Sequence, residues 1–369
     1  MLVIHLGAGN HDRRKTKSYK KLITHALKAN QPIIPTSSII EKSPLTNTGY
    51  GSCLNMLGEV ECDASIIVAN RINNTVSMKS LIGINDSLYP ISTTATVFSG
   101  IESLYNRTNT NQFGITMPIK LNYQSFSKYQ TFQLPCSNRD LVSSSAQTFY
   151  DTYQPKINLQ SANNVHETYQ PQISLLNSND SLCDDSDVGS VTDTIGLLEI
   201  DQNQTTIATS LGGNFFKVPG RIGCAGEIGS SIDFYRNTLN GLEISCLCSG
   251  NGEDIMQMKL SHYIVSNFDI NQNHNWGENL VNLIQNHLAG FDLFGKSKFN
   301  DDSILYVGVI VIINNIKDNW KRLIYCHSTE SFYFGFRIDD QKVDPNVVFS
   351  HLDDSSKVGK TFAYGEFKC

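Results

Sequence analysis

The chain has 369 residues, of which 40% are hydrophobic and 17% are charged, and its formal net charge is −6. That length allows one large domain or two ordinary ones, and the negative charge argues against a nucleic-acid scaffold. Nine cysteines without an even framework of spacings fit a reducing compartment better than a secreted disulfide protein.

No apolar segment predicts export or membrane insertion. Met1 to Leu6 is too short for the core of a signal peptide, and its flanks are wrong. The longest apolar run, Ile304 to Ile313, is half the length of a membrane span and predicts a buried strand. We therefore expect a soluble protein of the cytoplasm, the nucleus or both, with no membrane or nucleic-acid partner.

The chain opens with a predicted buried strand, Leu2 to Leu6, followed by a Gly-Ala-Gly turn. A glycine-rich turn after a strand is one mark of a dinucleotide-binding loop. The third glycine of that loop would fall at position 12, which is Asp12. The sequence therefore does not favour a nucleotide site here.

An amphipathic helix is predicted next. Apolar residues recur at helical spacing from Tyr19 to Leu27, and arginines and lysines from Arg13 to Lys21 occupy the other face. The basic face indicates a solvated surface, with a nuclear-import patch or an anionic docking surface as the alternatives. Pro32 and Pro35 are expected to break the helical pattern.

A glycine-rich block runs from Ser43 to Ser65. Glycines at positions 49, 51 and 58 predict tight turns between short strands, and the alternation from Glu59 to Ser65 predicts a strand with one polar face. Polar groups buried in such a segment need hydrogen-bond partners. The block is therefore a candidate wall of a functional site.

A long polar segment separates the two halves of the chain. A strand and a helix near residues 98–105 are expected before it, and from about residue 121 to 190 the pattern dissolves into Ser, Asn, Gln, Thr and Tyr. This composition predicts a disordered loop. Its internal repeat, with Tyr153-Gln154-Pro155 in one copy and Tyr169-Gln170-Pro171 in the other, is a candidate docking motif or merely tolerated low complexity.

A regular β pattern begins at Thr194. It predicts a strand from Thr194 to Ile200, a turn at 201–204 and a return strand from Thr205 to Ser210. If the bond between Asp193 and Thr194 is cut, Thr194 gains a free α-amine, with a pKa near ~8, beside its own hydroxyl. Such an amine can act as the general base for that hydroxyl. The alternative is a strand-initiating threonine after a flexible loop.

The remaining elements are predicted from apolar spacing. Met256, Leu260, Tyr263 and Ile264 share one face of a helix, and a second helix runs from about 278 to 288. The runs 304–313 and 323–336 predict a final hairpin of core strands. Cys246-x-Cys248 lacks the spacing of a zinc site, so no metal is expected.

Taken together, the motifs resemble those of the threonine aspartases (taspase-like proteins) in the asparaginase-2 family of N-terminal-nucleophile hydrolases. In the first half the resemblance is carried by the opening His-Leu-Gly-Ala-Gly-Asn-His and by the block from Ser-Pro-Leu-Thr-Asn-Thr-Gly to Glu-Cys-Asp-Ala-Ser. In the second half it is carried by Asp-Thr-Ile-Gly, Thr-Ser-Leu-Gly-Gly, Pro-Gly-Arg-Ile-Gly, Ser-Gly-Asn-Gly-Glu and His-Ser-Thr-Glu-Ser-Phe. One local departure is that the prolines shorten the helical pair that usually precedes the Ser-Pro.

The resemblance implies a fold and a maturation step. The expected fold is an α/β (α+β), four-layer αββα sandwich, one domain over residues 1–369 with the long loop before the nucleophile. The precursor is expected to be cut into an α part (1–193) and a β part (194–369), and two αβ units are expected to form a homodimer. No metal or organic cofactor is implied.

The resemblance also assigns roles to single residues. The assigned residues are Thr194 as nucleophile, Ser249 and Gly250 around the oxyanion or α-amino region, Asn47 as an orienting group, Arg221 as the carboxylate ligand, and Thr209 and Ser210 in the substrate-binding loop. A guanidinium suits a carboxylate because it donates two parallel hydrogen bonds. Asparaginases of the family usually have glycine before the nucleophile, whereas this chain has Asp193, as threonine aspartases do. The implied activity is a threonine-type endopeptidase that cuts itself and protein substrates after aspartate.

Two positions depart from the family pattern. Leu211 stands where a second hydroxyl precedes the glycine pair, and Cys224 stands where asparaginases have the aspartate that binds an α-ammonium group. Cys224 argues against small free amino acids as substrates. Leu211 keeps open a catalytically weak pseudoenzyme that binds partners through its Tyr-Gln-Pro loop, and asparaginase or isoaspartyl-peptidase activity is the other alternative.

Overall fold

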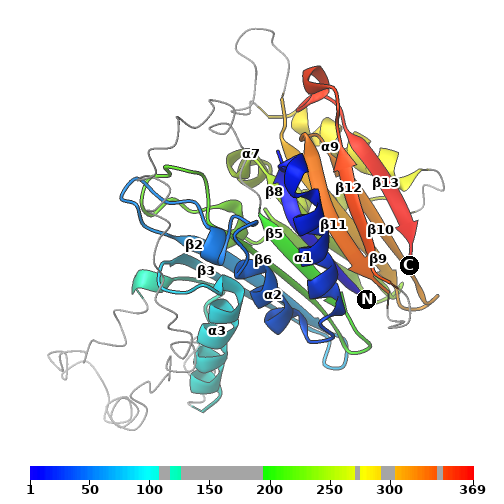
Figure 1. Ribbon diagram of the computed structural model, residues 1–369. Helices are drawn as coiled ribbons and strands as arrows, with labels where there is room; N and C mark the ends of the chain where they lie inside the picture. The colour runs from blue at the N-terminus through cyan, green and yellow to red at the C-terminus, as the bar shows by residue number, and fades with distance from the viewer. Residues whose placement is uncertain (108–116, 126–193, 271–274, 292–303, 339–343) are drawn as a thin grey trace, which may run out of the picture.

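The computed structural model describes residues 1–107, 117–125, 194–270, 275–291, 304–338 and 344–369, and these residues form two β-sheets (Figure 1). The strands of the larger sheet are Leu2–Gly9 (β1), Cys62–Asn70 (β2), Thr75–Ile84 (β3), Lys120–Asn122 (β4), Ile195–Ile200 (β5), Gln204–Leu211 (β6), Ser331–Arg337 (β11) and Asn346–His351 (β12). The strands of the smaller sheet are Ile232–Asn237 (β7), Leu242–Gly250 (β8), Val307–Asn315 (β9), Trp320–His327 (β10) and Ala363–Lys368 (β13). Their orders are β12-β11-β1-β5-β6-β2-β3-β4 and β13-β10-β9-β8-β7.

Helices cover the outer face of each sheet. The larger sheet is covered by Thr16–Lys28 (α1), Ile33–Glu41 (α2) and Pro90–Arg107 (α3), and the smaller sheet by Gly252–Met258 (α7), Leu260–Asn267 (α8) and Trp276–Leu288 (α9). One apolar core lies under each helical layer, and a third lies between the sheets. The described residues therefore form four layers, and the prediction of a mixed α/β fold is confirmed.

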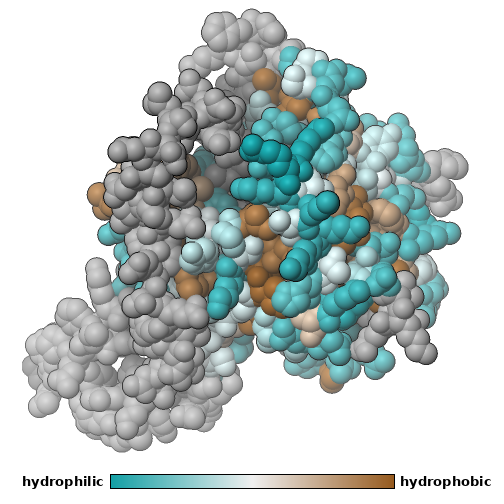
Figure 2. All heavy atoms as spheres, in the orientation of Figure 1, coloured by the Kyte–Doolittle hydropathy of each residue, from teal (hydrophilic) through white to brown (hydrophobic). Residues whose placement is uncertain are grey.

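The apolar spacing of α1 explains how it packs. Tyr19, Ile23 and Leu27 are buried against the larger sheet, whereas Lys17 and Lys20 are exposed. Figure 2 shows a hydrophilic surface over α1. The helix thus contributes apolar area to the core with one stripe only.

Strand β5 is buried on both faces because it lies near the middle of the larger sheet. Ile195 and Leu197 belong to the core under α1–α3, while Leu198 and Ile200 belong to the core between the sheets. This two-sided burial follows from the alternation of side chains along a strand. The predicted strand, turn and return strand after Thr194 are confirmed by β5 and β6.

Two expectations about helices need correction. The expected break is present at Pro32, between the end of α1 at Lys28 and the start of α2 at Ile33, but Pro35 does not break the helix, because α2 continues through it to Glu41. Pro35 lies in the first turn, where a backbone N–H has no partner within the helix to lose. Farther on, the single helix predicted around Met256 is divided into α7 and α8 at Lys259, whose φ of 48° is left-handed.

Two expectations about strands and loops also need correction, and two strands were missed. The predicted hairpin is present, since β9 and β10 pair antiparallel. It is not the final one, because β12 and β13 follow, and the run 323–336 is two strands, of which β11 pairs with β1 in the larger sheet. Strands β7 and β8 were not predicted. The start of the expected loop, at about 121, was placed too early, because residues 120–122 form β4 and pair with β3. The rest of that loop, with its Tyr-Gln-Pro repeat, lies outside the described residues.

Two kinds of feature were searched for in the residues that the structure describes: membrane-spanning helices and metal-binding groups. None of their helices is long and apolar enough to cross a membrane. Nor do they hold a group of three or more His, Cys, Asp or Glu side chains that could bind a metal ion.

Candidate active site

Thr194 lies at the start of β5 and is fully buried. Its side chain is on the same face of the strand as that of Gly196, two residues on, which is the face toward the smaller sheet. A Cβ at position 196 would overlap His5 Nε2 and would lie 2.8 Å from Leu247 Cδ2. Only glycine therefore fits there, and the Thr-x-Gly spacing has a steric cause. Asp193 lies outside the described residues.

Ser249 and Gly250 reach the same end of the sheets as Thr194. The antiparallel pairing of His5 with Gly196, continued along β1, brings Ala8 to the level at which β5 begins. The Ala8 N–H donates to Ser249 Oγ at 3.0 Å. Gly250 has a φ of 133° and packs against Tyr306 so closely that a Cβ would overlap its carbonyl oxygen. Ser249 and Gly250 are thus fixed beside the predicted nucleophile.

Cys224 is the polar partner of the Thr194 hydroxyl. The two side chains lie 3.7 Å apart, from Oγ1 to Sγ, and both are fully buried. Burial raises the pKa of the Cys224 thiol to about 11. A thiol that stays protonated at neutral pH is a weak hydrogen-bonding group and a poor base. Cys224 therefore cannot supply the base that the hydroxyl of Thr194 needs.

Arg221 offers one side of its guanidinium to the site. Its Nε and Nη2 atoms donate to Glu253 Oε1 at 3.0 and 2.6 Å, and its Nη1 atom is buried with no hydrogen-bond partner among the described residues. The guanidinium lies among three glycines. A Cβ at Gly213, Gly223 or Gly252 would lie 3.1 to 3.2 Å from Nη1 or Nη2. The glycines thus leave room for the guanidinium of Arg221.

Cys224 lies between Arg221 and Thr194. The position of a Cβ at Gly252 lies 3.2 Å from Arg221 Nη2 and 3.6 Å from Cys224 Sγ. The thiol in turn contacts Thr194. The structure therefore brings together four of the sequence-predicted features: Thr194, Arg221, the altered position 224 and the Ser249–Gly250 end of β8.

Asn47 holds the glycine pair that follows β6. Its backbone oxygen accepts the Gly212 N–H at 2.7 Å, and its Nδ2 donates to the Gly213 oxygen at 2.8 Å. Its Oδ1 accepts the Cys53 N–H at 2.8 Å. Because these groups are all used, Asn47 orients the loop beside Arg221 instead of contacting the hydroxyl of Thr194.

Thr209 and Ser210 use their hydroxyls within the protein. Thr209 Oγ1 donates to the Ile195 oxygen at 2.8 Å. Ser210 pairs with Ile195 across the strands but turns its hydroxyl to Glu41 Oε1, 2.8 Å away, on the helix-covered face of the sheet. That face is opposite to the one on which Thr194 lies. In this structure, neither residue presents a free hydroxyl to a substrate.

Leu211 fills the place expected for a second hydroxyl. Its side chain is 2% exposed, and its Cδ2 lies 3.1 Å from the position of a Cβ at Gly223. It therefore packs next to the loop that carries Arg221. The structure puts an apolar wall where the sequence pattern would place a proton donor or acceptor.

Three charged residues of the site were not singled out from the sequence: Glu41, Asp63 and Lys217. Asp63 accepts the N–H groups of Gly223 at 2.6 Å and Gly83 at 3.0 Å, which fixes the loop next to Arg221. Lys217 donates to the Gly212 oxygen at 2.8 Å and to the Glu61 oxygen. Burial lowers the pKa of Lys217 and raises that of Asp63. In the sequence, the feature that could have pointed to these three residues is a charged side chain within an otherwise apolar or glycine-rich run.

The mouth of the site carries exposed apolar side chains on two adjoining loops. They are Met56, Leu57, Phe215, Phe216 and Val218, each 54 to 69% exposed. The loops are joined because the Met56 N–H donates to the Lys217 oxygen at 2.9 Å. Phe216 has a φ of 56°, which is rare for an aromatic residue. Exposed apolar groups next to a polar site are typical of surfaces that bind macromolecules.

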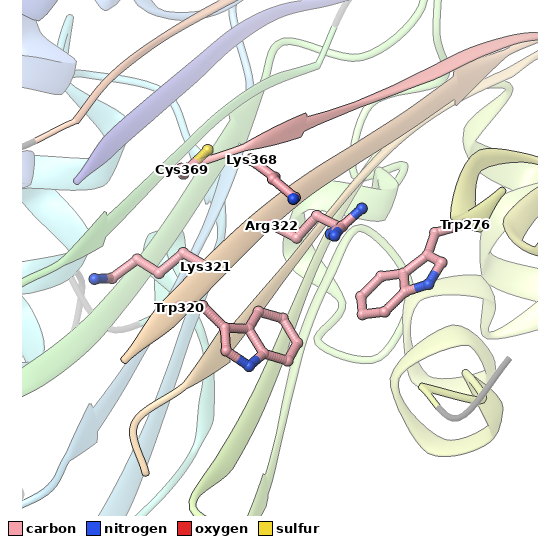
Figure 3. A pocket seen from close by; sticks show the side chains of 6 residues that line it. All are labelled: Trp276, Trp320, Lys321, Arg322, Lys368 and Cys369. Carbon is pink, nitrogen blue, oxygen red and sulfur yellow. The ribbon is translucent and has the colours of Figure 1, made fainter. Parts of the chain in front are cut away.

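A different hollow, of about 410 Å³, lies at the opposite end of the smaller sheet (Figure 3). It is lined by Trp276, Trp320, Lys321, Arg322, Lys368 and Cys369. The Arg322 guanidinium lies 4.7 Å from the centroid of the Trp276 ring and 2.7 Å from Glu366 Oε1. The arginine is therefore already satisfied by a cation–π contact and an ion pair. This hollow shares no residue with the site around Thr194.

The sequence matches the model of a known protein family over most of its length. The Asparaginase_2 family model, described as asparaginase, matches residues 1–281. The matched region contains Thr194, Arg221, Cys224 and the Ser249–Gly250 end of β8. It therefore includes the four features that the structure gathers around the start of β5.

Proposed function

The chain belongs to the asparaginase-2 family of N-terminal-nucleophile hydrolases, and we propose that within this family it is a threonine-type endopeptidase. It cuts itself between Asp193 and Thr194, which divides the chain into an α part and a β part. It then cuts protein substrates after aspartate. The observation that carries this proposal is Cys224, in contact with Thr194, at the place where an asparaginase would bind the α-ammonium group of its substrate.

Self-cleavage uses the groups around Thr194 in two steps. Oγ of Thr194 attacks the carbonyl carbon of Asp193, the Asp193–Thr194 C–N bond breaks, and the proton of the hydroxyl passes to the departing nitrogen. An ester between Asp193 and Thr194 results, and the nitrogen becomes the free α-amine of Thr194. Water then hydrolyses the ester to give the carboxylate of Asp193 and the hydroxyl of Thr194. The free amine is afterwards the general base for that hydroxyl.

Substrate cleavage repeats this chemistry with the amine in place. The Thr194 hydroxyl attacks the backbone carbonyl of the substrate aspartate, and the oxyanion is stabilised by donors at the Ser249–Gly250 end of β8, where a glycine lets backbone approach closely. Arg221 Nη1, which is buried and has no described partner, receives the aspartate carboxylate. A charge-assisted hydrogen bond to a buried guanidinium is among the stronger polar contacts.

Two features support a peptide substrate over a free amino acid. Cys224 is neutral because its thiol is buried, so it offers no charge to an α-ammonium group. The exposed apolar loops at the mouth would contact the residues that flank an internal aspartate. Asparaginase and isoaspartyl-peptidase activities require a free α-amine that this site does not match.

A second candidate is a pseudoenzyme, and Leu211 supports it. The buried leucine removes a hydroxyl from the neighbourhood of the nucleophile. In that case the protein would bind peptides at its apolar mouth without cutting them.

The test compares three substrates with the purified full-length chain. We expect cleavage of a peptide with an internal aspartate, and much slower release of ammonia from free asparagine or of aspartate from a β-aspartyl dipeptide. Faster turnover of asparagine would overturn the endopeptidase proposal in favour of an asparaginase. Binding of the aspartyl peptide without cleavage, together with an intact chain, would favour the pseudoenzyme.

A further inference from the structure

A buried carboxyl lies directly behind the strand that carries the nucleophile. Glu41, the last residue of α2, has no exposed surface. Its Oε1 accepts the Ser210 hydroxyl at 2.8 Å and the Ile91 N–H at 3.0 Å. Its Oε2 lies 3.4 Å from the Ser37 hydroxyl. Ser210 and the Ile91 N–H are donors, and Ser37 shares its proton with the Ile34 oxygen, 2.8 Å away. The carboxyl is therefore solvated by the protein instead of by water.

The contact with Ser210 links Glu41 to the start of β5. Ser210 pairs with Ile195, the residue after Thr194. Its hydroxyl also lies 2.8 Å from Thr48 Oγ1, and either oxygen can be the donor in that pair. One carboxyl therefore controls a chain of two hydroxyls.

The contact with Thr48 links Glu41 to the other side of the site. Thr48 follows Asn47, which holds the backbone of Gly212 and Gly213. Gly213 adjoins Arg221, since a Cβ there would lie 3.2 Å from Nη1. The network thus ends at the nucleophile strand on one side and at the glycine pair beside the arginine on the other.

We propose that Glu41 is a positioning residue for Thr194 and for the Gly212–Gly213 loop, because its ionisation sets the direction of the hydrogen bond between Ser210 and Thr48. When Glu41 is ionised, Ser210 donates to it and accepts from Thr48. When Glu41 is protonated, it donates to Ser210, and the Ser210 hydroxyl turns to donate to Thr48. The switch moves one proton onto Glu41 and breaks no covalent bond.

The surroundings of Glu41 allow both states near neutral pH. Its neighbours are Ser37 of α2 itself, the Ile91 N–H of α3 and Ser210 of β6. None of these groups is charged, and no charged side chain contributes to the shift of its pKa. Burial raises the pKa of Glu41 to about 7, against the pull of the three donors. The kinetic consequence of the switch rests on the proposed function, but the switch itself does not.

The first test is the pH dependence of self-cleavage, followed by intact mass, in the wild-type chain and in Glu41→Gln. The uncut chain has no α-amine at Thr194, so the amine cannot produce a pH effect. We expect the wild-type rate to rise through a midpoint near 7. Glu41→Gln should be about 10-fold slower at high pH, the loss of one charge-assisted hydrogen bond, and should lack that midpoint. A Glu41→Gln variant that keeps the wild-type midpoint would overturn the proposal.

The second test does not need activity. In Thr194→Ala, the side-chain carboxyl resonance of Glu41 is assigned by its absence from the Thr194→Ala/Glu41→Gln chain and is titrated by NMR. We expect the backbone amides of Ser210, Gly212 and Gly213 to shift with the same midpoint. Amides that do not follow the titration would refute the switch, whether or not the wild-type chain cuts itself.

Matched variants test whether Glu41 acts through the Ser210–Thr48 hydrogen bond or only stabilises the fold. Ser210→Ala should leave the titration of Glu41 in place but remove its effect on Gly212 and Gly213. Ser37→Ala removes a hydroxyl from the same carboxyl but has no route to the glycine pair, so it should preserve the coupling. If Ser37→Ala and Ser210→Ala have the same effect on the coupling between the Glu41 titration and the Gly212 and Gly213 amides, Glu41 stabilises the fold and is not a positioning residue. These variants also decide the matter if Glu41→Gln fails to fold.

Discussion

Replacing Arg221 by glutamine should damage substrate recognition with little effect on stability. Arg221 Nη1 is buried without a described partner, so it is the donor available to a substrate carboxylate. One charge-assisted hydrogen bond contributes about 1.5–3 kcal/mol. Its loss corresponds to a decrease of about 10- to 150-fold in kcat/KM.

The effect of the same substitution on stability is expected to be small. The Arg221–Glu253 ion pair has side chains that are 15% and 38% exposed, so solvent screens the pair. Such a pair contributes about 0–1 kcal/mol. In a chain of this size that loss lowers Tm by only about 1 °C. The predicted result is therefore a large kinetic defect in a folded protein.

The assay measures kcat and KM for two peptides that differ only in aspartate or asparagine before the cut. Wild type should prefer aspartate, and Arg221→Gln should lose that preference mainly through KM. Glu253→Gln is the matched control, because it removes the carboxylate that competes for the guanidinium and should leave KM unchanged or lower. An Arg221→Gln enzyme with wild-type kcat/KM for the aspartyl peptide would refute the assignment of Arg221.

Four further outcomes are expected. Gly196→Ala should lower the free energy of unfolding by about 1–3 kcal/mol, because its Cβ would overlap His5; an unchanged urea midpoint would show that the site relaxes. Cys224→Asp should raise kcat/KM for β-aspartyl dipeptides relative to internal aspartyl peptides, and a constant ratio would show that position 224 does not face the α-amine. The Leu211→Ser variant should cleave itself faster than the Leu211→Ala variant, which removes a similar volume without adding a hydroxyl. Equal self-cleavage rates would mean that a hydroxyl at position 211 is not needed. Burial lowers the pKa of His327 from 6.5 to about 4. Between these values the unfolded chain binds a proton that the folded chain does not, so the free energy of unfolding should fall as pH drops from 6.5 to about 4. His327→Gln should weaken this pH dependence, and an unaltered pH dependence would contradict a neutral buried histidine.

The central strands were predictable because alternation and turn residues specify them locally. Thr194 to Ser210 shows a strand, a polar turn and a second strand, and the structure has β5 and β6 there. Helix α1 was predictable from its single apolar stripe. Boundaries that depend on one backbone angle were not predictable. Lys259 adopts a left-handed conformation that nothing in its own residue type favours.

The assignment of strands to sheets needs long-range information. Residues 323–336 were assigned to one hairpin from their apolar content, which the polar segment 327–331 interrupts, but β10 and β11 lie in different sheets. The same limit applies to the site. The motifs predicted the residues that surround Thr194, yet Ser210 and its partner Glu41 are 169 positions apart. A spacing pattern cannot show which face a hydroxyl takes, so the role of Ser210 required the structure.

The most direct test of the proposed activity is the intact mass of the purified chain followed over time. Two fragments that meet between Asp193 and Thr194 are expected from the wild-type chain, and Thr194→Ala should stay whole under the same conditions. Cys224→Ala serves as a control, because it alters the group that contacts the hydroxyl but keeps the nucleophile. A wild-type chain that stays whole at every pH, or that is cut equally in Thr194→Ala, would contradict the account.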